Sequence, residues 1–474
     1  MKLLIEGHNK IYDLQSIASA FFPGQSFSDG LPLVESKVVE EENEIICNTL
    51  IKGENRAIEK SYSVLKNNGD AVRIAVKGAF FEAAKEYTGI IPPWGEFSGI
   101  RPVKYMSSLS EDINTAKEKF ISSLGVSRPK AELCERVMNL RKNMEFEQGI
   151  KDFSLYISIP FCPSRCAYCS FISQAGEKML SLVPDYLNTL CNELEAVGEI
   201  AKNNRLKLRS IYIGGGTPGI LSPKESELLL KKIQCSFDLS YLKEYTVEAG
   251  RPDTVTAEKL KVLHNFGVDR ISINPQTLNN SVLTAIGRKH TAEQFYKAYS
   301  AAENIGFKSI NTDLIVGLPE DTLESFENTM SEILRLSPGN ITVHSLCLKK
   351  SSWLRVDDNT GFLKNKEAIE MSEYSNTVLL QNGYEPYYMY KQKNAVGSLE
   401  NTGFCKEGLA SYYNIIMMDD IQNVIGVGAG STTKLFFLGD PLRVYNCKYP
   451  FEYISHKEKL TENINIINEF FENH

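Results

Sequence analysis

The amino-acid sequence predicts an α/β protein built on a partial barrel of six βα units, a (βα)6 barrel, with an N-terminal α/β domain and a C-terminal α+β extension. From about residue 153, short β-branched runs alternate with longer amphipathic segments, which is typical of βα units with parallel strands. The less common polar residues follow the predicted strands, and reacting groups gather at these strand ends in βα barrels. A doubly wound open sheet has the same alternation and is the alternative architecture.

Six strands and six helices account for this alternation. The strands are expected to begin near Leu155, Ser210, Tyr245, Arg270, Ile310 and Ile341. The helices are expected to begin near Pro184, Pro223, Thr256, Thr291, Thr322 and Lys366. Two of these helix starts carry a capping signal, because Thr256 and Thr291 can accept hydrogen bonds from the first helical turn and are each followed closely by a glutamate.

A chain of 474 residues exceeds one typical domain. Three parts of it differ in their pattern of predicted helices, strands and turns. Residues 1–150 mix polar helical stretches with a turn-rich segment at residues 91–102, and we expect a separate N-terminal domain there, whose role the sequence does not indicate. Residues 151–350 are the predicted barrel. Residues 351–474 are the predicted extension, with a helix at 364–384 and a strand at 384–390.

Composition and charge exclude several classes of protein. The 42% of hydrophobic and 23% of charged residues are typical of a folded globular chain. A net charge of −7 argues against a nucleic-acid partner held by a strongly basic field. No apolar run approaches the roughly 20 residues that a membrane-spanning helix needs, and the N-terminal segment reaches Glu6 after only three apolar residues. We therefore expect a cytoplasmic protein without a membrane span.

Three of the ten cysteines lie close together in the sequence. Cys162, Cys166 and Cys169 follow the first predicted strand with the spacing C-x3-C-x2-C. Three thiolates at this spacing can hold one face of a four-iron four-sulfur (4Fe-4S) cluster and leave the fourth iron open. Structural zinc is the alternative interpretation, but zinc normally takes four protein ligands, and no nearby His or Cys supplies the fourth.

Two glycine-rich segments have different implications. Gly214–Pro218, with the sequence GGGTP, follows the second predicted strand, where residues without side chains let backbone amides approach a polar ligand. A tight strand-to-helix turn is the simpler interpretation of this run. Gly426–Gly430 resembles a dinucleotide-binding loop, but Ser431 stands where G-x-G-x-x-G has its last glycine, and we reject a Rossmann-type site.

Four polar residues fall at or near the ends of predicted strands. Glu248, Gln276 and Asp313 belong to the third, fourth and fifth strands, and Arg288 lies in the loop after the fourth. Because they converge from successive strands, they can hold the amine, carboxylate and hydroxyl groups of a cofactor through charge-assisted hydrogen bonds. Each residue alone is explained as well by a salt bridge or a cap at the barrel rim. Their joint placement beside the cysteine loop favours the cofactor interpretation.

These motifs together resemble the HemN-like family of radical S-adenosylmethionine (SAM) proteins. Within residues 153–350 they are YISIPFCPSRCAYCSF, YIGGGTP, VEAGRPD, SINPQT, GRKHT and NTDLIVGLPEDT. Outside this part, PPWGEFSGIRPVKYM, MYKQKN, SLENTGF and YYNIIMMDD resemble the HemZ branch, the longer coproporphyrinogen dehydrogenases with an added N-terminal domain. The resemblance covers most of the chain, and the fold it implies, a partial radical SAM barrel of six βα units, agrees with the strand count.

The resemblance implies a 4Fe-4S cluster and SAM as cofactors, with roles for individual residues. Cys162, Cys166 and Cys169 would hold the cluster, and Tyr156 would lie beside it. Tyr168 would contact the adenine of SAM. The methionine end of SAM would be contacted by Gly215, Gly216 and Thr217, and the rest of its pocket would be formed by Glu248, Gln276, Arg288 and Asp313. No catalytic residue beyond these cofactor ligands is implied.

The same resemblance implies a radical SAM oxidoreductase of heme and porphyrin biosynthesis. Its reaction would be the oxidative decarboxylation of two propionates of coproporphyrinogen III to the vinyl groups of protoporphyrinogen IX, through a 5'-deoxyadenosyl radical. The partners would be this porphyrinogen and a low-potential electron donor. Candidates for binding the substrate carboxylates are Arg251, Arg288, Lys289, Lys391 and Lys393. Candidates for packing on the tetrapyrrole are Tyr387, Tyr388 and Tyr390, although packing in a core is the commoner role of such strand residues.

Two departures from the family pattern leave a second function open. Cys169 is followed by Ser170 and Phe171 without another nearby cysteine, and Ser158 stands where the family has a histidine. HemN-like proteins that lack the extra cysteine include HemW-like heme chaperones, which keep SAM and the 4Fe-4S cluster but do not oxidise coproporphyrinogen. The histidines of the core, His264, His290 and His344, are expected to pack or to cap rather than to bind heme iron.

Overall fold

A parallel sheet forms the centre of the protein. The computed structural model describes residues 1–22, 25–169, 174–347, 361–437 and 439–474. Six strands pair in parallel in the order β12-β11-β10-β9-β8-β5. Their bounds are β5 (Asp152–Ile159), β8 (Lys207–Gly215), β9 (Glu244–Gly250), β10 (Arg270–Ile273), β11 (Ser309–Val316) and β12 (Asn340–Ser345). All six predicted strands are thereby confirmed.

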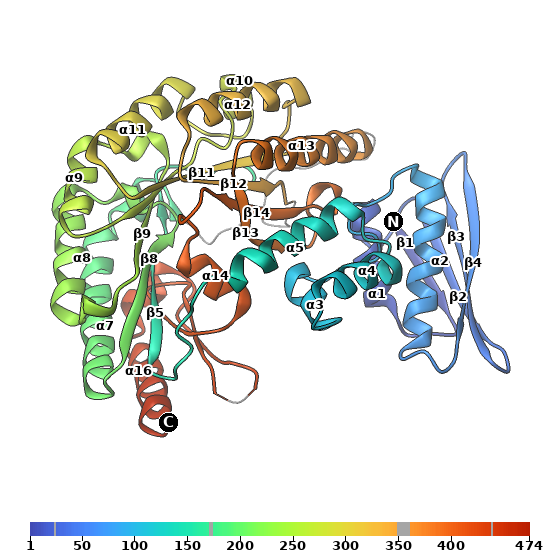
Figure 1. Cartoon of the computed structure of the whole chain (residues 1–474), viewed down its shortest axis with the longest axis horizontal. Coiled ribbons are helices and arrows are strands. Elements are labelled where there is room, and N and C mark those ends of the chain that lie inside the picture. The colour runs from blue at the N-terminus through green and yellow to red at the C-terminus, as the bar shows by residue number, and fades with distance from the viewer. Residues whose placement is uncertain (23–24, 170–173, 348–360, 438) are drawn as a thin grey trace.

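Helices cover the outer face of this sheet (Figure 1). They are α7 (Val183–Asn203), α8 (Pro223–Ser236), α9 (Ala257–Asn265), the short α10 (Asn280–Ala285), α11 (Ala292–Ile305), α12 (Leu323–Leu336) and α13 (Gly361–Gln381). The capping signals are confirmed, because the side chains of Thr256, Thr291 and Thr322 accept hydrogen bonds from backbone amides of the first turn. α13 begins at Gly361, earlier than the predicted start at Lys366.

The sheet continues beyond both ends of the parallel set and does not close. Its full order is β13-β14-β12-β11-β10-β9-β8-β5-β15-β16-β17. The added strands are β13 (Glu385–Lys391), β14 (Glu400–Cys405), β15 (Asn423–Val427), β16 (Thr432–Leu435) and β17 (Leu442–Tyr445). The strand predicted at 384–390 is β13. Gly426 of β15 pairs in parallel with Tyr156 of β5, so the GVGAG segment begins within the sheet and is no dinucleotide loop. The fold is therefore α/β, with the parallel strands arranged as an open, partial barrel.

The C-terminal part completes one end of this sheet with three helices. They are α14 (Tyr412–Asp419), α15 (Pro450–Ser455) and α16 (Lys457–Glu472). A buried carboxylate, Glu193 of α7, joins this part to the barrel, since it accepts hydrogen bonds from the Gly428 amide at 2.8 Å and the Tyr453 hydroxyl at 2.6 Å. Across the described ranges, none of the helices has the combination of length and apolar character that crossing a membrane requires.

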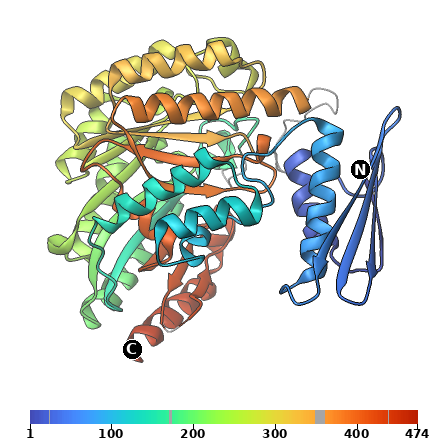
Figure 2. The same ribbon diagram turned by 45° about the vertical axis from the view of Figure 1, so that its right-hand side comes forward.

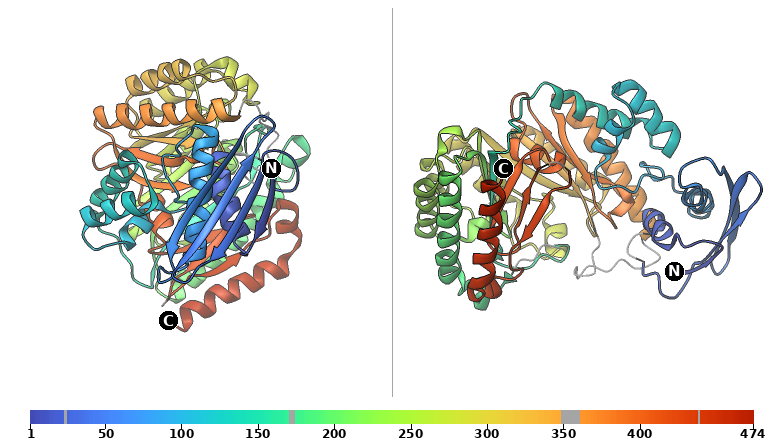
Figure 3. Two further views of the ribbon diagram at one scale, coloured as in Figure 1. Left: turned by 90° about the vertical axis from the view of Figure 1, so that its right-hand side faces the viewer. Right: turned by 90° about the horizontal axis from the view of Figure 1, so that it is seen from below.

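Residues 1–88 form a smaller α/β unit with a hydrophobic core of its own (Figures 2 and 3). Its strands pair in the order β1 (Lys2–Glu6), β2 (Leu33–Glu40), β3 (Glu44–Lys52) and β4 (Ala57–Leu65). The helix α2 (Ala71–Thr88) packs on this sheet, and the helix α1 (Ile11–Phe21) packs against α2. The ring of Phe21 meets the rings of Phe80 and Phe81 edge to face, which fixes α1 against α2.

The next three helices belong to the large core instead. They are α3 (Pro102–Ser108), α4 (Ile113–Leu124) and α5 (Arg128–Lys142). Trp94 and Phe120 are fully buried in the same hydrophobic cluster as the parallel strands. The hydrophobic cores therefore divide between Tyr87 and Trp94. The limits at residues 150 and 350 stay a prediction about the domains.

A buried ion pair holds α5 to the sheet. Lys130 of α5 and Glu400 of β14 are each 2% exposed, and the Lys130 ammonium lies 2.5 Å from Glu400 Oε1. The second carboxylate oxygen accepts a hydrogen bond from Trp94 Nε1 at 2.7 Å. Burial raises the pKa of Glu400, but the charge and hydrogen bond of Lys130 outweigh this effect and lower that pKa. One carboxylate thus joins three segments that are far apart in the sequence.

We predict that Lys130→Met lowers the free energy of unfolding by about 3–5 kcal/mol, because it leaves the Glu400 carboxylate buried without its counter-charge. Urea denaturation followed by circular dichroism measures this change. The control is Lys104→Met on the exposed side of α3, for which we expect a change below about 0.5 kcal/mol. Equal stability of both variants would contradict the assigned role of the ion pair.

Candidate functional site

A cavity of about 380 Å³ opens at the carboxyl ends of the parallel strands. It is lined by all twelve residues that the sequence assigns to the cluster or to SAM, which are Tyr156, Cys162, Cys166, Tyr168, Cys169, Gly215, Gly216, Thr217, Glu248, Gln276, Arg288 and Asp313. Consecutive parallel strands bring their carboxyl ends to one edge of the sheet, which explains how residues far apart in the sequence converge. Their individual roles stay predictions.

Side-chain alternation decides which strand residues reach this cavity. Successive side chains of a strand point to opposite faces, so Asn311, Asp313 and Ile315 of β11 line the cavity together. The same rule brings in lining residues that sequence reasoning missed, namely Tyr212, Ser272, Asn274, Asn311, Thr342 and Asn401. Counting two positions back from Asp313 would have found Asn311, whereas Asn401 comes from β14, which was not predicted.

The cysteine loop packs directly on the glycine-rich turn. Cys162 ends the short strand β6 (Phe161–Cys162), and its side chain and that of Cys166 are almost fully buried. The Cys162 sulfur lies 3.3 Å from the Thr217 hydroxyl. The Cys169 amide donates a hydrogen bond to the Cys166 carbonyl at 3.2 Å. The loop therefore presents three cysteines at one end of the cavity. Ser170 and Phe171, which bear on the missing fourth cysteine, lie outside the described residues.

The donor set of this loop fits a 4Fe-4S cluster. In the part of the chain that the structure describes, no three His, Cys, Asp or Glu side chains gather closely enough to hold a single metal ion. A cluster binds its three thiolates through three separate iron atoms, so it holds them farther apart than one zinc ion does. The soft thiol donors and their place at the cavity wall match a cluster whose fourth iron faces the cavity.

The glycine run has a steric reason. Gly215 has a φ of +111°, a conformation that other residues rarely adopt, and a Cβ on Gly216 would lie 2.5 Å from the Phe161 carbonyl oxygen. The amides of Gly216 and Thr217 donate to the carbonyls of Ile159 and Phe161, both at 2.8 Å. The tight-turn interpretation is confirmed. The amides of Gly216 and Thr217 are engaged within this turn, and the contact of these two residues with SAM stays a prediction.

Four ionisable side chains line the cavity and interact in two pairs. The Tyr212 hydroxyl donates to Glu248 Oε1 at 2.6 Å, and burial raises the pKa of Glu248 to about 7. Asp313 Oδ2 lies 3.6 Å from His344 Nε2. Burial alone would raise the pKa of Asp313 and lower that of His344, but their mutual interaction reverses both directions. Near neutral pH, Asp313 is therefore a carboxylate, while Glu248 is close to its titration midpoint.

The segment after β10 ties the cofactor residues to the cysteine loop. Arg288 donates to the Tyr168 hydroxyl from Nη2 at 2.9 Å and from Nε at 3.2 Å. The Ala167 amide donates to the Ile286 carbonyl at 3.0 Å. Gln276 has a left-handed φ of +70°, and its amide donates to the Asp313 carbonyl at 3.0 Å. Such conformations are uncommon outside glycine and gather at functional sites.

The residues proposed to bind substrate do not all reach this cavity. Arg251 lines it, but its guanidinium pairs with Asp253 at 2.7 Å and donates to the Ser164 hydroxyl at 2.6 Å. Lys289 is exposed and lines neither this cavity nor the pocket beside α1. Lys391 and Lys393 line a different pocket. The charged clamp expected for a tetracarboxylate is therefore incomplete among the described residues of the cavity.

Among the aromatic and histidine residues singled out from the sequence, some line the cavity and others lie outside it. Tyr388 and Tyr390 line the cavity with nearly parallel rings, whose centroids are 6.4 Å apart. Tyr387 does not line the cavity, and it packs on Tyr388 in one buried cluster. His344 lines the cavity, but His290 is 2% exposed and lies outside it. His264 packs its ring edge to face on Phe307, as expected of a packing histidine.

Comparisons with known proteins agree with this geometry. The model of the Radical SAM superfamily matches residues 156–333. The oxygen-independent coproporphyrinogen-III oxidase-like protein HemZ of Bacillus subtilis is 35% identical over 421 residues, which cover 85% of this chain and 82% of that protein. The heme chaperone HemW of Lactococcus lactis is 34% identical over 60% of this chain and 70% of that protein. Coproporphyrinogen III oxidase (HemN) from Escherichia coli, a radical SAM enzyme, has a TM-score of 0.51 at 20% identity, covers 70% of this chain and 73% of its own, and supports the fold alone.

The matched family accounts for the cysteine loop and for the cavity beside it. Radical SAM proteins hold a 4Fe-4S cluster and SAM, so these are the cofactors of this chain, and residues 156–333 include all three cysteines of the loop. The similarity to HemZ extends far beyond that part, into both flanking regions. The chain therefore belongs to the radical SAM superfamily and, within it, to the family of HemN, HemZ and HemW.

Proposed function

We propose that this protein is an oxygen-independent coproporphyrinogen III dehydrogenase, which converts two propionates of its substrate into vinyl groups. The observation that carries the proposal is the similarity to HemZ over 85% of the chain, which includes segments far from the cofactor cavity. Cofactor binding alone would not require those segments. A porphyrinogen, a low-potential electron donor and a cytoplasmic location follow as parts of the same proposal.

The residues of the cavity have separate tasks in this proposal. When bound, the cluster and SAM supply a 5'-deoxyadenosyl radical, which can remove a hydrogen atom from the substrate. Cys162, Cys166 and Cys169 hold the cluster, and the carboxylates of Glu248 and Asp313 bind the amine and hydroxyl groups of SAM. Tyr388 and Tyr390 also line the cavity, and we assign to them the packing on the apolar macrocycle. No side chain has to transfer a proton for the hydrogen abstraction.

Heme delivery, as in HemW, is the second candidate function. It is favoured by the 34% identity to the Lactococcus lactis heme chaperone and by the incomplete clamp for four carboxylates. Against heme delivery stands the environment of His344, the histidine that lines the cavity, because this side chain is not available to bind heme iron. Its Nε2 faces Asp313, and its Nδ1 lies 3.3 Å from Asn401 Oδ1, so both ring nitrogens are engaged.

Anaerobic turnover separates the two functions. The reconstituted protein is incubated with SAM, a chemical reductant and coproporphyrinogen III, and the porphyrin products are oxidised and analysed by mass spectrometry. We expect the successive loss of two carboxyl groups in the parent protein and no loss in Cys162→Ala. Stoichiometric heme binding without any decarboxylated product would favour the carrier.

We predict that alanine at Cys162, Cys166 or Cys169 removes most of the bound iron and sulfide, because each thiolate is one of three protein anchors of the cluster. Iron analysis and visible absorption after anaerobic reconstitution measure the loss. The matched control is Cys235→Ala on the exposed side of α8, which should keep a full cluster. A full cluster in all three single variants of the motif would remove the assignment.

We predict that Glu248→Ala and Asp313→Ala weaken SAM binding about 10- to 100-fold at unchanged iron content, because each removes a charge-assisted hydrogen bond. Glu258→Ala on the exposed surface of α9 is the control. The pKa of Glu248 adds a pH dependence. Since its pKa is about 7, the carboxylate that binds the SAM ammonium is mostly protonated at pH 6.0 and mostly ionised at pH 7.4.

SAM affinity should therefore rise several-fold from pH 6.0 to pH 7.4, and this rise should vanish in Glu248→Gln. Equilibrium dialysis with labelled SAM at the two pH values measures it. The same pH dependence in the parent and in Glu248→Gln would mean that another group titrates.

A further inference from the structure

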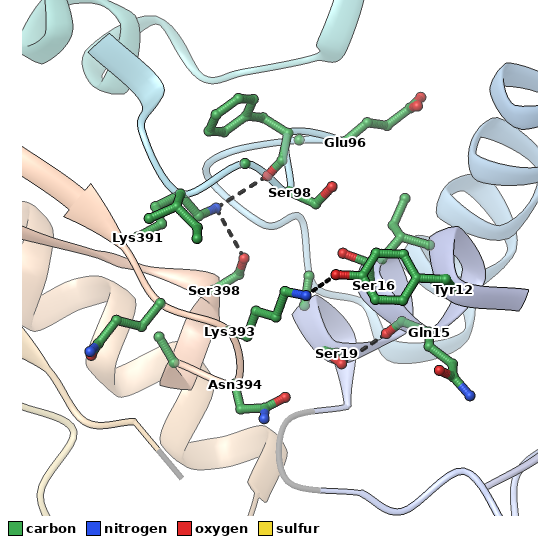
Figure 4. Close-up of a pocket in the computed structure, with 18 of the residues that line it drawn as sticks. Tyr12, Gln15, Ser16, Ser19, Glu96, Ser98, Lys391, Lys393, Asn394 and Ser398 are labelled. Carbon is green, nitrogen blue, oxygen red and sulfur yellow. Dashed lines mark hydrogen bonds between the residues drawn. The ribbon is translucent and has the colours of Figure 1, made fainter. Parts of the chain in front are cut away.

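A second pocket, of about 180 Å³, lies where the small N-terminal unit meets the large core (Figure 4). Three segments form its walls, namely α1, residues 95–100, and residues 391–398 after β13. The pocket is thus built from parts of both hydrophobic cores. Gln392 lines this pocket as well as the cofactor cavity, so the two spaces adjoin.

The Lys391 side chain is the most unusual feature of this pocket. The residue is 5% exposed, and its ammonium donates to the Phe97 carbonyl and to the Ser398 hydroxyl, both at 3.2 Å (Figure 4). It also lies 5.1 Å from the centre of the Trp94 ring. Among the described residues, no carboxylate lies within ion-pair distance of this ammonium. Buried charges are normally paired, so holding the Lys391 ammonium in its charged form without a carboxylate partner is unfavourable.

The buried charges around the pocket do not balance. Glu400, the carboxylate with the largest effect on the pKa of Lys391, is already engaged by Lys130 at 2.5 Å. Glu96 lines the pocket, but Figure 4 shows its carboxylate turned away from Lys391. Lys130 and Lys77 both lower the pKa of Lys391, so two further lysines add positive charge around this ammonium. Burial lowers the pKa of Lys391 to about 7, and a bound anion would raise that pKa again.

The remaining polar groups of the pocket suit an anion. Lys393 reaches the rim from the same strand end, where its ammonium contacts the Tyr12 hydroxyl of α1 (Figure 4). Gln15, Ser16 and Asn394 add amide and hydroxyl groups to the walls. Two lysines with neutral donors around a small space can bind a carboxylate by charge-assisted hydrogen bonds.

We propose that this second pocket is a carboxylate-binding site, with Lys391 as its buried anchor and Lys393 at its rim, closed on one side by α1 of the N-terminal unit. The carboxylate has two possible sources. It is either a propionate arm of the tetrapyrrole, held next to the cofactor cavity, or a separate small carboxylic acid. Only the first source rests on the proposed function. In both cases the N-terminal unit gains a role, because it supplies one wall of the site.

The test uses the full chain with its cluster and needs no turnover, so it is independent of the proposed activity. Isothermal titration calorimetry measures the binding of coproporphyrin III, of its uncharged tetramethyl ester, and of glutarate. For glutarate, Trp94 fluorescence in a Trp353→Phe background locates the binding event beside Lys391. We expect Lys391→Met to weaken carboxylate binding about 10- to 100-fold. Lys393→Gln should weaken it a few-fold, as expected of a more exposed charge.

The exposed Lys224→Gln of α8, which lines neither pocket, serves as the matched control and should bind like the parent. Loss of coproporphyrin affinity in the lysine variants, with no such loss for its ester, assigns the site to a propionate arm. Loss of glutarate affinity without competition by coproporphyrin assigns it to a separate acid. The proposal would be overturned if both Lys393→Gln and a Lys391→Met variant with the circular dichroism spectrum of the parent bound both acids with unchanged affinity. If Lys391→Met does not fold, Lys393→Gln and the comparison of acid with ester decide the question.

Discussion

The parallel pairing of β5, β8, β9, β10, β11 and β12 in sequence order is the constraint on which the site depends. It brings the carboxyl ends of six strands to one edge, so each strand delivers its last inward-facing side chains to the same cavity. A shift of one residue in the register of β11 would turn Asp313 out of the cavity and bring its neighbours in. The buried side chains of this sheet, such as Ile157 and Leu314, therefore position the polar ones.

The cysteine loop depends on its neighbours as much as on its own spacing. It rests on Gly216, where a side chain would collide with the Phe161 backbone, and it is held from the far side by Arg288 through the Tyr168 hydroxyl. Loss of any of these contacts would move the thiols relative to Glu248 and Asp313, although none of them touches the cluster in our account. The cofactor site is thus a joint property of the βα units that begin with β5, β8, β9, β10 and β11.

Periodicity and capping predict much of this architecture from the sequence. The alternation of β-branched and amphipathic segments predicts the six strands, and Thr256 and Thr291 predict the helix starts after two of them. The strands β14 to β17 are harder to predict, because they are short and their pairing is decided by distant contacts, such as that of β15 with β5. The boundary of the N-terminal core cannot be predicted from the sequence for the same reason. Trp94 belongs to the large core because it donates a hydrogen bond to Glu400, a residue that is far away in the sequence.

In the candidate site too, residues that belong to a local motif can be predicted from the sequence, whereas residues brought in by long-range pairing cannot. Residues carried by a recognisable motif, such as Cys162 and Glu248, are found in the cavity, whereas Asn401 enters it by strand pairing that no local pattern announces. Charge pairing is also invisible in the sequence. Arg251 looks like a free substrate ligand until the structure shows its pairing with Asp253, and Lys391 looks like an exposed lysine until its burial is known.

The central claim is that this cavity directs hydrogen abstraction at a porphyrinogen propionate. Coproporphyrinogen III that carries deuterium on the propionate β-carbons tests this claim directly, in an anaerobic reaction with SAM and a reductant. We predict that deuterium is found in 5'-deoxyadenosine in step with vinyl formation, since the hydrogen atom would pass directly from substrate to cofactor. Cleavage of SAM with unlabelled 5'-deoxyadenosine and no vinyl product would contradict the account.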